Sequence, residues 1–428
     1  MKFTAVGDAI IQQNIPEDYN GFEEIKDFIS KGDARFFNLE TTLNEEGECY
    51  ASQFSGGTYL RTNPCVLKDL KKFGFNMVNF NNNHSMDFSY DGLLKTIEHI
   101  KASGLVQSGV GRNLDEASAP KYLDTKNGRV ALISVNTTFD PSMMAGVQSK
   151  RVKGRPGING LRYNKTQIVT KDDFEVIKRV GTQTGINNEI INDIKDGYLS
   201  PWPDDVCCLE NIRFMVGEKT GQITTINETD MKRVEKAIFD AQLQADYILI
   251  SLHTHKMEDI NLEITPKFIE EFCRRCIDCG AHAIIGHGPH LLRGIEVYKE
   301  RPIFYSLGDF ILQLYSVEFA PEDFYSKYGL TSGDGIYSLI KTRSKDFNIG
   351  LMEKNIYQEA IIPYWEMENG KLTKLELLPI TCYKQNNKSV SGLPVVNFDT
   401  NIAERLVELS KPYGVDMEVE NGIIHCKW

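Results

Sequence analysis

The sequence predicts an α/β fold. Short apolar segments rich in β-branched residues alternate with longer amphipathic segments of helical period, and this alternation is typical of strands and helices that build a mostly parallel sheet. Several strand-like segments end in a polar residue, as Gly7-Asp8 and Leu39-Glu40 do. Functional residues in α/β folds gather at the carboxyl ends of strands, so we expect a site at these ends.

Composition and charge exclude several classes of protein. The chain has 428 residues, 41% hydrophobic and 25% charged, which is ordinary for a globular protein of two or three domains or of one large sandwich. The net charge of −11 argues against a general nucleic-acid binder, which needs a basic face. Nine scattered cysteines do not resemble a disulfide framework. We find no signal peptide and no run of roughly 20 apolar residues for a membrane span, so we expect a cytoplasmic protein.

The part of the chain up to residue 136 supplies three polar strand ends. Asp8 follows the first predicted strand, Glu40 ends the second, and Asn83 with His84 follows the third. Each of these residues, taken singly, is explained as a turn or cap residue. We predict strands over residues 3–6, 34–40, 75–80, 106–110 and 130–136, and helices over residues 21–31, 65–73 and 92–103.

Residues 137–227 break the alternation, and we predict that they form an insertion. The insertion contains a basic, glycine-rich loop with Arg151, Arg155 and Arg162, then helical stretches over about 170–195, then an irregular part after Pro203. Two interpretations of the loop stay open. It is either a solvated surface or a lid that binds anions, because the planar guanidinium group suits carboxylates and phosphates.

Two later strand ends carry histidines. A helix over residues 229–245 leads to a strand over 247–252, which ends in His253-Thr254-His255. The apolar run 283–285 precedes Gly286-His287-Gly288-Pro289-His290, whose glycines and proline predict a tight turn. Neutral imidazoles held on such a turn are good metal ligands near pH 7.

The helix predicted over residues 266–280 carries three cysteines at a spacing of three. Cys273, Cys276 and Cys279 then share one helix face, where cysteine behaves as a small hydrophobic residue, and we favour this over a metal site. Beyond this helix we predict a strand and turn over 303–311, a strand pair over 357–364 and 371–381, a helix over 401–410, and a strand pair around Asn421-Gly422.

Together, the polar strand ends form a candidate metal site. Its residues are Asp8, Glu40, Asn83, His84, His253, His287 and His290. A mixed set of carboxylate, amide and imidazole ligands suits Mn, Fe or Zn better than calcium. One carboxylate can bridge two ions, as is common in two-metal hydrolases. The sequence therefore predicts one or two divalent transition metals as cofactor.

The runs around these residues also resemble a known family. They are Gly7-Asp8, Asn38-Leu39-Glu40, Asn82-Asn83-His84, Asp87, His253, Gly286-His287-Gly288-Pro289-His290 and Tyr305-Ser306-Leu307-Gly308-Asp309-Phe310. The family is that of the CapA proteins of bacterial capsule, or poly-γ-glutamate, biosynthesis, which have a calcineurin-like metallophosphoesterase fold. The resemblance implies a four-layer α-β-β-α sandwich, with a catalytic core over residues 1–345 that includes the insertion at about 137–227, and with residues 346–428 completing the same sandwich.

The resemblance also implies roles for single residues. His84 would lie beside the leaving group as general acid. Asp87 would either orient His84 or cap the following helix, and both alternatives stay open. The implied metal ligands are Asp8, Glu40, Asn83, His253, His287 and His290. The candidates for binding an anionic substrate are Arg61, Arg151, Arg155 and Arg162.

Three positions depart from the pattern of these families. The metallophosphoesterase fold has a histidine where this chain has Ile10 and an aspartate where it has Glu40, and Asp309 replaces an asparagine of the capsule proteins. One metal site therefore lacks a ligand. We expect two groups of ligands: Asn83, His253, His287 and Glu40 in the fuller site, and Asp8 with His290 in the poorer one.

Three hypotheses on function follow. The first is a metal-dependent hydrolase that uses metal-activated water on a phosphoester or a γ-glutamyl-type amide, with an anionic small molecule or polymer as substrate. The alternative is a non-catalytic accessory protein of poly-γ-glutamate or capsule polymer synthesis, because Ile10 indicates a degenerate metal site. The third is an anion-binding module built on the basic loop.

Overall fold

The computed structural model describes residues 1–17 and 19–428. The chain divides into two compact units, one made of Met1–Leu161 with Lys232–Trp428 and the other of Arg162–Met231. The second unit falls largely within the segment predicted as an insertion. None of the described helices combines the length and the apolar composition that crossing a membrane requires.

The first unit is built on two large sheets, of which the larger has ten strands. Its central strand β1 (Lys2–Ile10) pairs with β2 (Ala34–Leu39) in parallel and with β20 (Glu359–Glu368) antiparallel. The order is β23-β24-β21-β20-β1-β2-β5-β6, with β19 beside β1 and β22 beside β21. The other strands are β5 (Met77–Asn79), β6 (Val106–Ser108), β19 (Asp309–Leu312), β21 (Lys371–Thr381), β22 (Val395–Val396), β23 (Asp416–Glu420) and β24 (Ile423–Lys427).

The second sheet of this unit has six strands in the order β17-β18-β16-β15-β9-β8. The four inner strands run parallel, so that their carboxyl ends lie at one edge. The strands are β8 (Lys121–Thr125), β9 (Gly128–Asn136), β15 (Tyr247–His253), β16 (Ala283–His287), β17 (Ile295–Tyr298) and β18 (Arg301–Phe304).

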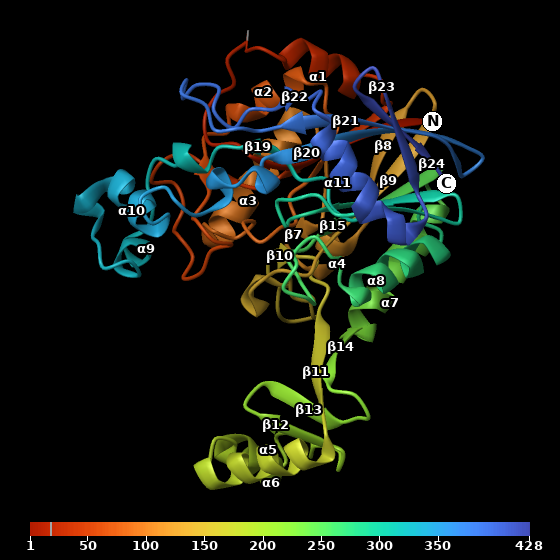
Figure 1. Ribbon diagram of the computed structural model, residues 1–428. Helices are drawn as coiled ribbons and strands as arrows, with labels where there is room; N and C mark the ends of the chain where they lie inside the picture. The colour runs from red at the N-terminus through yellow and green to blue at the C-terminus, as the bar shows by residue number, and fades with distance from the viewer. Residues whose placement is uncertain (18) are drawn as a thin grey trace. The chain divides into compact units, whose positions relative to one another are not determined.

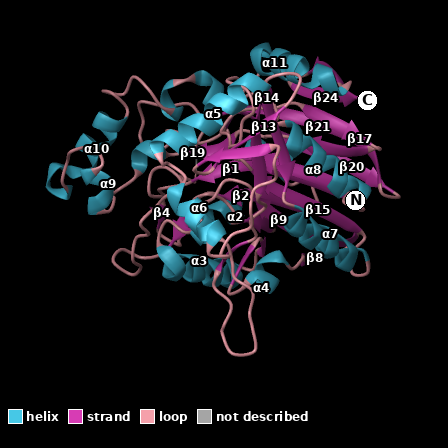
Figure 2. Ribbon diagram, turned by 90° about the horizontal axis from the view of Figure 1, so that it is seen from below, coloured by secondary structure: helices cyan, strands magenta, loops and turns pink. Residues whose placement is uncertain are grey.

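One buried core holds the two sheets face to face. Phe3 of β1 stacks on Trp365 of β20 with ring centroids 5.1 Å apart, and both belong to the same buried cluster as Leu249 of β15 and Phe304 of β18. Successive side chains of a strand point to opposite faces of the sheet, so apolar residues on the outer face of each sheet must also be covered. The strands of these two sheets thus form the two inner layers of a sandwich (Figure 2).

Helices cover the outer faces of this sandwich. Phe37 of β2 packs in a cluster with α1 (Phe22–Ile29), α2 (Val66–Lys72) and α3 (Ser89–Ser103). On the smaller sheet, the Arg301 guanidinium of β18 donates to the Ile277 carbonyl of α8 (Lys267–Asp278) at 3.0 Å. In Figure 1, α1 to α3 lie on the opposite side of the strands from α8. The predicted α/β sandwich is confirmed.

Most predicted elements are found within a few residues of their predicted ends. The strand pair at Asn369-Gly370 is β20 with β21, and the pair at Asn421-Gly422 is β23 with β24. All four turn residues have positive φ, as hairpins of the Asn-Gly type require. Cys273 and Cys276 are buried on α8 and are free, as expected for small hydrophobic residues on a helix face.

Strand β1 is longer than predicted. We expected it to end at Val6, but it continues to Ile10 with an irregular register around Asp8. Gly7 makes this possible, because a Cβ atom there would lie 1.8 Å from the Gly308 carbonyl oxygen. The close approach of two backbones lets β19 pair with the end of β1, and it sets Asp309 opposite Asp8.

The second unit contains strands where we predicted an irregular segment. Helices α5 (Lys171–Thr184) and α6 (Asn188–Lys195) match the prediction, but β12 (Val206–Leu209), β13 (Ile212–Val216) and β14 (Gly221–Ile226) follow Pro203. With β11 (Tyr163–Val169) they form a sheet of order β12-β13-β11-β14. The strands are short and partly exposed, so their apolar pattern is weak, and pairing decides their conformation: β13 and β14 pair with β11, and β12 pairs with β13.

The remaining elements are short or lie between the larger ones. The two-residue strands are β3 (Thr42–Leu43), β4 (Arg61–Thr62), β7 (Val110–Gly111) and β10 (Gly157–Ile158), and the helices are α4 (Leu114–Ser118), α7 (Glu228–Gln242), α9 (Glu322–Ser326), α10 (Gly335–Arg343) and α11 (Thr400–Ser410). Helices α9 and α10 belong to the mostly helical segment 313–358, which connects β19 to β20 and which the sequence did not predict.

The contact between Gly7 and Gly308 can be tested by adding one methyl group. We expect Gly7→Ala to lower the free energy of unfolding by about 3 kcal/mol, because the new Cβ forces β1 and the Gly308 turn apart. Urea unfolding followed by circular dichroism measures the change. Gly221→Ala is the control, since its Cβ meets nothing within 4 Å, and it should change stability by less than about 0.5 kcal/mol. Equal stability of Gly7→Ala and wild type would contradict the structure.

Candidate functional site

The carboxyl ends of strands from both sheets meet in the first unit. Asp8 lies on β1 and Glu40 directly follows β2, while Asn83 lies in the turn after β5. From the smaller sheet, His253 ends β15 and His287 ends β16, and the strand register sets these two histidines side by side. Face-to-face packing of the sheets thus brings the ends of non-neighbouring strands into one cluster.

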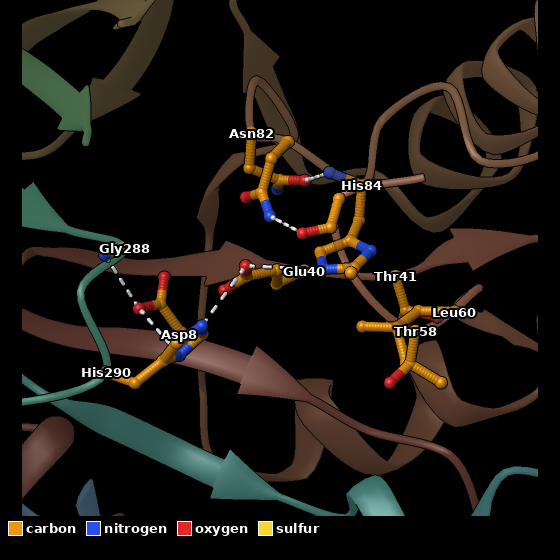
Figure 3. A network of polar contacts seen from close by, with 12 residues as sticks. Asp8, Glu40, Thr41, Thr58, Leu60, Asn82, His84, Gly288 and His290 are labelled. Atoms are coloured by element: carbon orange, nitrogen blue, oxygen red, sulfur yellow. Dashed lines mark hydrogen bonds and ion pairs between the residues drawn. The ribbon is translucent and has the colours of Figure 1, made fainter. Parts of the chain in front are cut away.

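The Glu40 carboxylate is the centre of this cluster. It is fully buried, and neither of its oxygens accepts a hydrogen bond within the described structure. Its Oε1 atom instead lies 3.8–3.9 Å from four imidazole nitrogens. These are the Nε2 atoms of His84, His253, His255 and His290. Figure 3 shows Glu40 between His84 and the turn that carries His290.

The Asp8 carboxylate is held more firmly. The Asn38 side-chain amide donates to Oδ1 at 2.6 Å, and the Gly288 backbone N–H donates to Oδ2 at 2.8 Å. The Nδ1 atoms of His287 and His253 lie 3.5 Å and 3.8 Å from Oδ1. Asp8 is therefore oriented by fixed donors while it faces the histidines.

The ligands group differently from the expected division. His287 does not stand beside Glu40: its Nδ1 lies 2.9 Å from His253 Nδ1, and its Nε2 lies 2.7 Å from Ser251 Oγ. His255 takes the place beside Glu40, and its Nε2 is 3.1 Å from Asn83 Oδ1. The His287 ring is occupied by Ser251 and His253 of the neighbouring strand, whereas His255 comes from the loop after β15.

Two residues of the cluster were missing from the predicted site. His255 offers a third ligand atom to the group of Glu40 and His253, and Asp309 joins Asp8 and His290. His290 Nδ1 lies 2.8 Å from Asp309 Oδ1, while Asp309 Oδ2 is buried without a hydrogen bond. The run His253-Thr254-His255 at a strand end could have pointed to His255. Asp309 follows the Gly308 turn, and only the pairing of β19 with β1 shows that it belongs to the cluster.

The carboxylates and imidazoles of the cluster strongly shift one another's pKa values. Burial raises the pKa of Glu40 well above its ordinary value, and the charges of Asp8 and Asp309 raise it further. Burial also raises the pKa of Asp309, to about 6, although His290 opposes the shift. Burial acts in the same direction on Asp8, but His287 and the other histidines outweigh it and hold its pKa below the ordinary value.

Two of the four histidines around Glu40 are shifted towards the neutral form. Burial lowers the pKa of His253 and of His255 well below the ordinary value, and neighbouring imidazoles lower both further. A neutral imidazole keeps a lone pair for a metal ion. An ion with bonds of about 2.1 Å holds its ligand atoms roughly 3–4 Å apart, which matches the spacing around Glu40. The buried, unbonded oxygens of Glu40 and Asp309 and the converging nitrogens therefore fit a divalent cation.

His84 is held by Asp87 at the border of the cluster. Its Nδ1 lies 2.7 Å from Asp87 Oδ2, and Asp87 also accepts the backbone N–H groups of Leu60 and Gly56 at 2.8 Å and 3.1 Å. Burial raises the pKa of Asp87, with His84 opposing the shift. Helix α3 begins at Ser89 without a side-chain cap, so Asp87 contacts His84 and does not cap the helix. Nε2 of His84 stays directed at Glu40.

A chain of asparagines links the two carboxylate strands to the His84 turn. Asn38 Oδ1 accepts from the side-chain amides of Asn79 at 2.5 Å and Asn82 at 3.1 Å, while Asn38 donates to Asp8. Asn82 Oδ1 in turn accepts the His84 backbone N–H at 3.1 Å. Asn38 and Asn82 belong to runs that resemble the family, but the sequence did not predict their hydrogen bonds to one another or to Asp8.

A cavity of about 510 Å³ opens beside the cluster. His84, His255 and His290 line it, and Ile10 faces it from β1. Much of the remaining wall comes from the 313–358 segment, which supplies Leu314, Tyr315, Ile340, Arg343, Ser344, Ile349, Gly350, Leu351, Met352, Lys354 and Tyr357. The cavity is large enough for a small organic substrate.

None of the predicted anion-binding arginines is among the described residues that line this cavity. Arg61 pairs with Glu318 at 3.7 Å, and Arg162 of the second unit makes a bidentate pair with Asp230 at 2.8 Å and 3.0 Å. Arg151 and Arg155 are exposed in the basic loop. Their role in substrate binding stays a prediction.

Comparison with protein families agrees with the resemblance in the sequence. The bacterial capsule synthesis protein family PGA_cap matches residues 2–314. The chain belongs to this family. Its match covers both carboxylate strands, the histidine turns and the start of the 313–358 segment.

This PGA_cap protein is similar in sequence to several other proteins. It is 30% identical to the uncharacterized protein y4sH of Sinorhizobium fredii over 98% of this chain and 91% of that one. It is 23% identical to the capsule biosynthesis protein CapA of Bacillus anthracis over 73% of this chain, which corresponds to 59% of that protein. A Mycobacterium tuberculosis protein named "Probable polyglutamine synthesis accessory protein" is 22% identical over 65% of this chain and 55% of its own.

A solved structure with a weak likeness is that of a hypothetical protein from Thermus thermophilus. It covers 89% of this chain and 98% of its own, at 10% identity and a TM-score of 0.37.

Because the oxygens of Glu40 accept no hydrogen bond, we expect a divalent cation to stabilise the protein. We expect Mn²⁺ or Zn²⁺ at one hundred times its dissociation constant to raise the free energy of unfolding by about 2.7 kcal/mol, because the ion binds only the folded protein. Thermal unfolding in chelator and in metal measures the shift.

We expect Glu40→Gln to lose most of this metal-dependent shift, since the neutral amide offers a cation no charge. Glu376→Gln on β21 is the matched control, because Glu376 is also nearly buried but pairs with Lys374 at 2.8 Å. An equal metal shift in the Glu40→Gln and control proteins would refute the assignment of Glu40 to a cation site.

Proposed function

We propose that this protein is a metal-dependent hydrolase that holds one or two divalent transition metal ions at the strand ends. The observation that carries the proposal is the Glu40 carboxylate, which is buried without a hydrogen bond while four imidazole nitrogens point at it. The residues that would hold the ions are Asp8, Glu40, Asn83, His253, His255, His287, His290 and Asp309. When bound, such ions polarise the bond to be cleaved and activate a water molecule.

The place of Ile10 supports two metal positions of unequal strength. Ile10 packs with Leu312 and Met352 and so offers no ligand to the group of Asp8 and His290. Asp309 enters that same group as an additional carboxylate. We infer that Asp309 compensates in part for the missing histidine, which gives the weaker position an oxygen-rich set of ligands.

His84 is the proposed proton donor of the reaction. Asp87 holds Nδ1, and Asp87 already accepts two backbone N–H groups, so it serves as the acceptor and His84 Nδ1 carries the proton. Nε2 faces both Glu40 and the cavity. As the water oxygen attacks and the scissile bond breaks, a proton on Nε2 would pass to the departing oxygen or nitrogen.

Two substrate classes are proposed for this chemistry. The names of the relatives from Bacillus and Mycobacterium refer to capsule and polyglutamine synthesis, which supports an amide of γ-glutamyl type. The resemblance to metallophosphoesterases supports a phosphoester. Both are anionic, and in both the leaving atom needs a proton, so the same cluster serves either substrate.

The proposal predicts which variants separate chemistry from metal binding. We expect His84→Ala to lower kcat by about 100-fold or more with unchanged metal content, since it removes only the proton donor. Asp8→Ala and His287→Ala should lose both metal and activity. Elemental analysis and hydrolysis of glycerol 2-phosphate, whose alkoxide leaving group needs a proton, and of γ-glutamyl-p-nitroanilide are measured on the same samples. Wild-type protein without bound transition metal and without activity on either compound would refute the proposal.

A second candidate function is that of a non-catalytic accessory protein of capsule polymer synthesis. Ile10 in place of a metal ligand and the word accessory in the name of the Mycobacterium relative support it. This candidate requires that Asp8→Ala and His287→Ala still complement a strain that lacks the gene. Failure of both variants to complement, at normal protein levels, would count against it.

A further inference from the structure

The cavity has a second charged group besides the metal cluster. Arg343 ends helix α10, and its guanidinium lines the cavity together with Lys354 of the same 313–358 segment. Arg343 lies outside the strand ends that carry the cluster, and nothing in the metal cluster requires it. Its surroundings therefore need an explanation of their own.

The contacts of Arg343 are to neutral groups. Its Nη1 donates to the Thr58 hydroxyl, its guanidinium lies over the Phe324 ring at 5.4 Å, and it hydrogen-bonds the Tyr328 side chain. No carboxylate lies within ion-pair distance of Arg343 in the part of the chain that the structure describes. Burial lowers the pKa of Arg343, and Tyr328 opposes the shift.

The surroundings of Arg343 differ from those of other arginines of the first unit. Arg274 pairs with Glu296 at 2.9 Å and Arg275 pairs with Glu235 at 2.7 Å. Arg293 has no ion pair among the described residues either, but it is fully buried and donates to the Leu262 and Lys256 carbonyls at 3.0 Å and 2.9 Å. Arg343 instead lines a cavity, so a ligand can supply the opposite charge that its partly buried guanidinium lacks. The open side of Arg343 faces the cavity, where such a ligand would enter.

A short loop, Gly56-Gly57-Thr58, connects Arg343 with the metal cluster. A Cβ atom on Gly56 would lie 2.8 Å from His84 Nε2, and one on Gly57 would lie 3.6 Å from Arg343 Nη2. Thr58, the next residue, accepts the hydrogen bond of Arg343. Because neighbouring Cα atoms are about 3.8 Å apart, the guanidinium lies on the order of 10 Å from His84. One small molecule can span this distance.

We propose that Arg343, assisted by Lys354, binds a second acidic group of the substrate while the group to be hydrolysed lies at the metal cluster. The ligand class is therefore a molecule with an oxyanion on each side of a short carbon chain. The apolar wall of the cavity, formed in part by Ile10, Leu314 and Ile340, would contact that chain. The proposal deepens the proposed function and rests on it for the reacting end only.

The test measures equilibrium binding and so does not depend on turnover. Isothermal titration of the metal-loaded protein uses glutarate, with two carboxylates, and propane-1,3-diphosphonate, with two phosphonates. We expect Arg343→Gln to weaken binding of at least one of them by about tenfold or more, because a charge-assisted hydrogen bond pair is lost. The probe that loses more identifies the remote group as carboxylate or phosphate. Inorganic phosphate, which reaches only the metal end, should bind with unchanged affinity.

Two further variants keep the test decisive. Lys341→Gln removes a charge from the same helix at an exposed pair with Asp346, and it should leave all affinities unchanged. Lys354→Gln keeps Arg343 but removes the second basic group of the cavity wall, and it should also weaken the two-ended probes. If Arg343→Gln fails to fold, Lys354→Gln decides the matter.

The outcomes separate this inference from the proposed function. Unchanged affinity for both probes in Arg343→Gln, or in Lys354→Gln where the first variant does not fold, overturns the inference even if the wild type is an active metalloenzyme. Loss of glutarate or diphosphonate affinity in a protein that binds no metal and hydrolyses nothing supports the anion site while refuting the hydrolase. A loss confined to inorganic phosphate also overturns the inference, because it places Arg343 at the metal end.

Discussion

The repulsion among buried carboxylates organises this protein. Asp8, Glu40 and Asp309 come together at the ends of three strand segments, away from water, and the charges of Asp8 and Asp309 add to burial in raising the pKa of Glu40. Burying such charges is unfavourable unless opposite charges or hydrogen bonds offset it. Asp8 has its fixed donors and Asp309 has His290, but Glu40 has only imidazole nitrogens too distant to donate. A cation between them would offset the repulsion, and this is the physical basis of the proposed metal centre.

The scaffold achieves this concentration of charge through backbone contacts. The sandwich core around Phe3 and Trp365 fixes the two sheets against each other, so strand ends from both sheets keep a constant separation. Gly7 and Gly308 then let β19 approach β1 more closely than any residue with a Cβ would. The chain of asparagines that begins at Asn38 holds the His84 turn to these strands by hydrogen bonds. A cluster that must hold atoms to a fraction of an ångström is thus carried by strands and short turns rather than by long loops.

Two parts of the chain that lie far apart in the sequence line the cavity. The strand ends give it the histidines and the apolar Ile10, whereas the 313–358 segment gives it Arg343, Lys354 and most of the remaining wall. The cavity thus has the candidate metal cluster at one side and two basic residues at the other, which is the arrangement that the proposed acidic substrate requires. Named members of the family are linked to capsule synthesis. Variation of the segment would change which acid is bound while the strand ends stay the same.

The sequence by itself determined the α/β class, the predicted strand ends and the family, because these depend on local hydrophobic period and on short runs such as Gly286 to His290. It also named Asp8, Glu40, Asn83, His84, His253, His287 and His290 as one cluster, since parallel strands carry their functional residues at their carboxyl ends. Tertiary structure alone decided that His255 replaces His287 beside Glu40, that Asp309 faces Asp8, and that Arg343 lines the cavity. These depend on ring orientation, on the close approach of two glycines and on the path of a long connecting segment, none of which leaves a periodic signal in the chain.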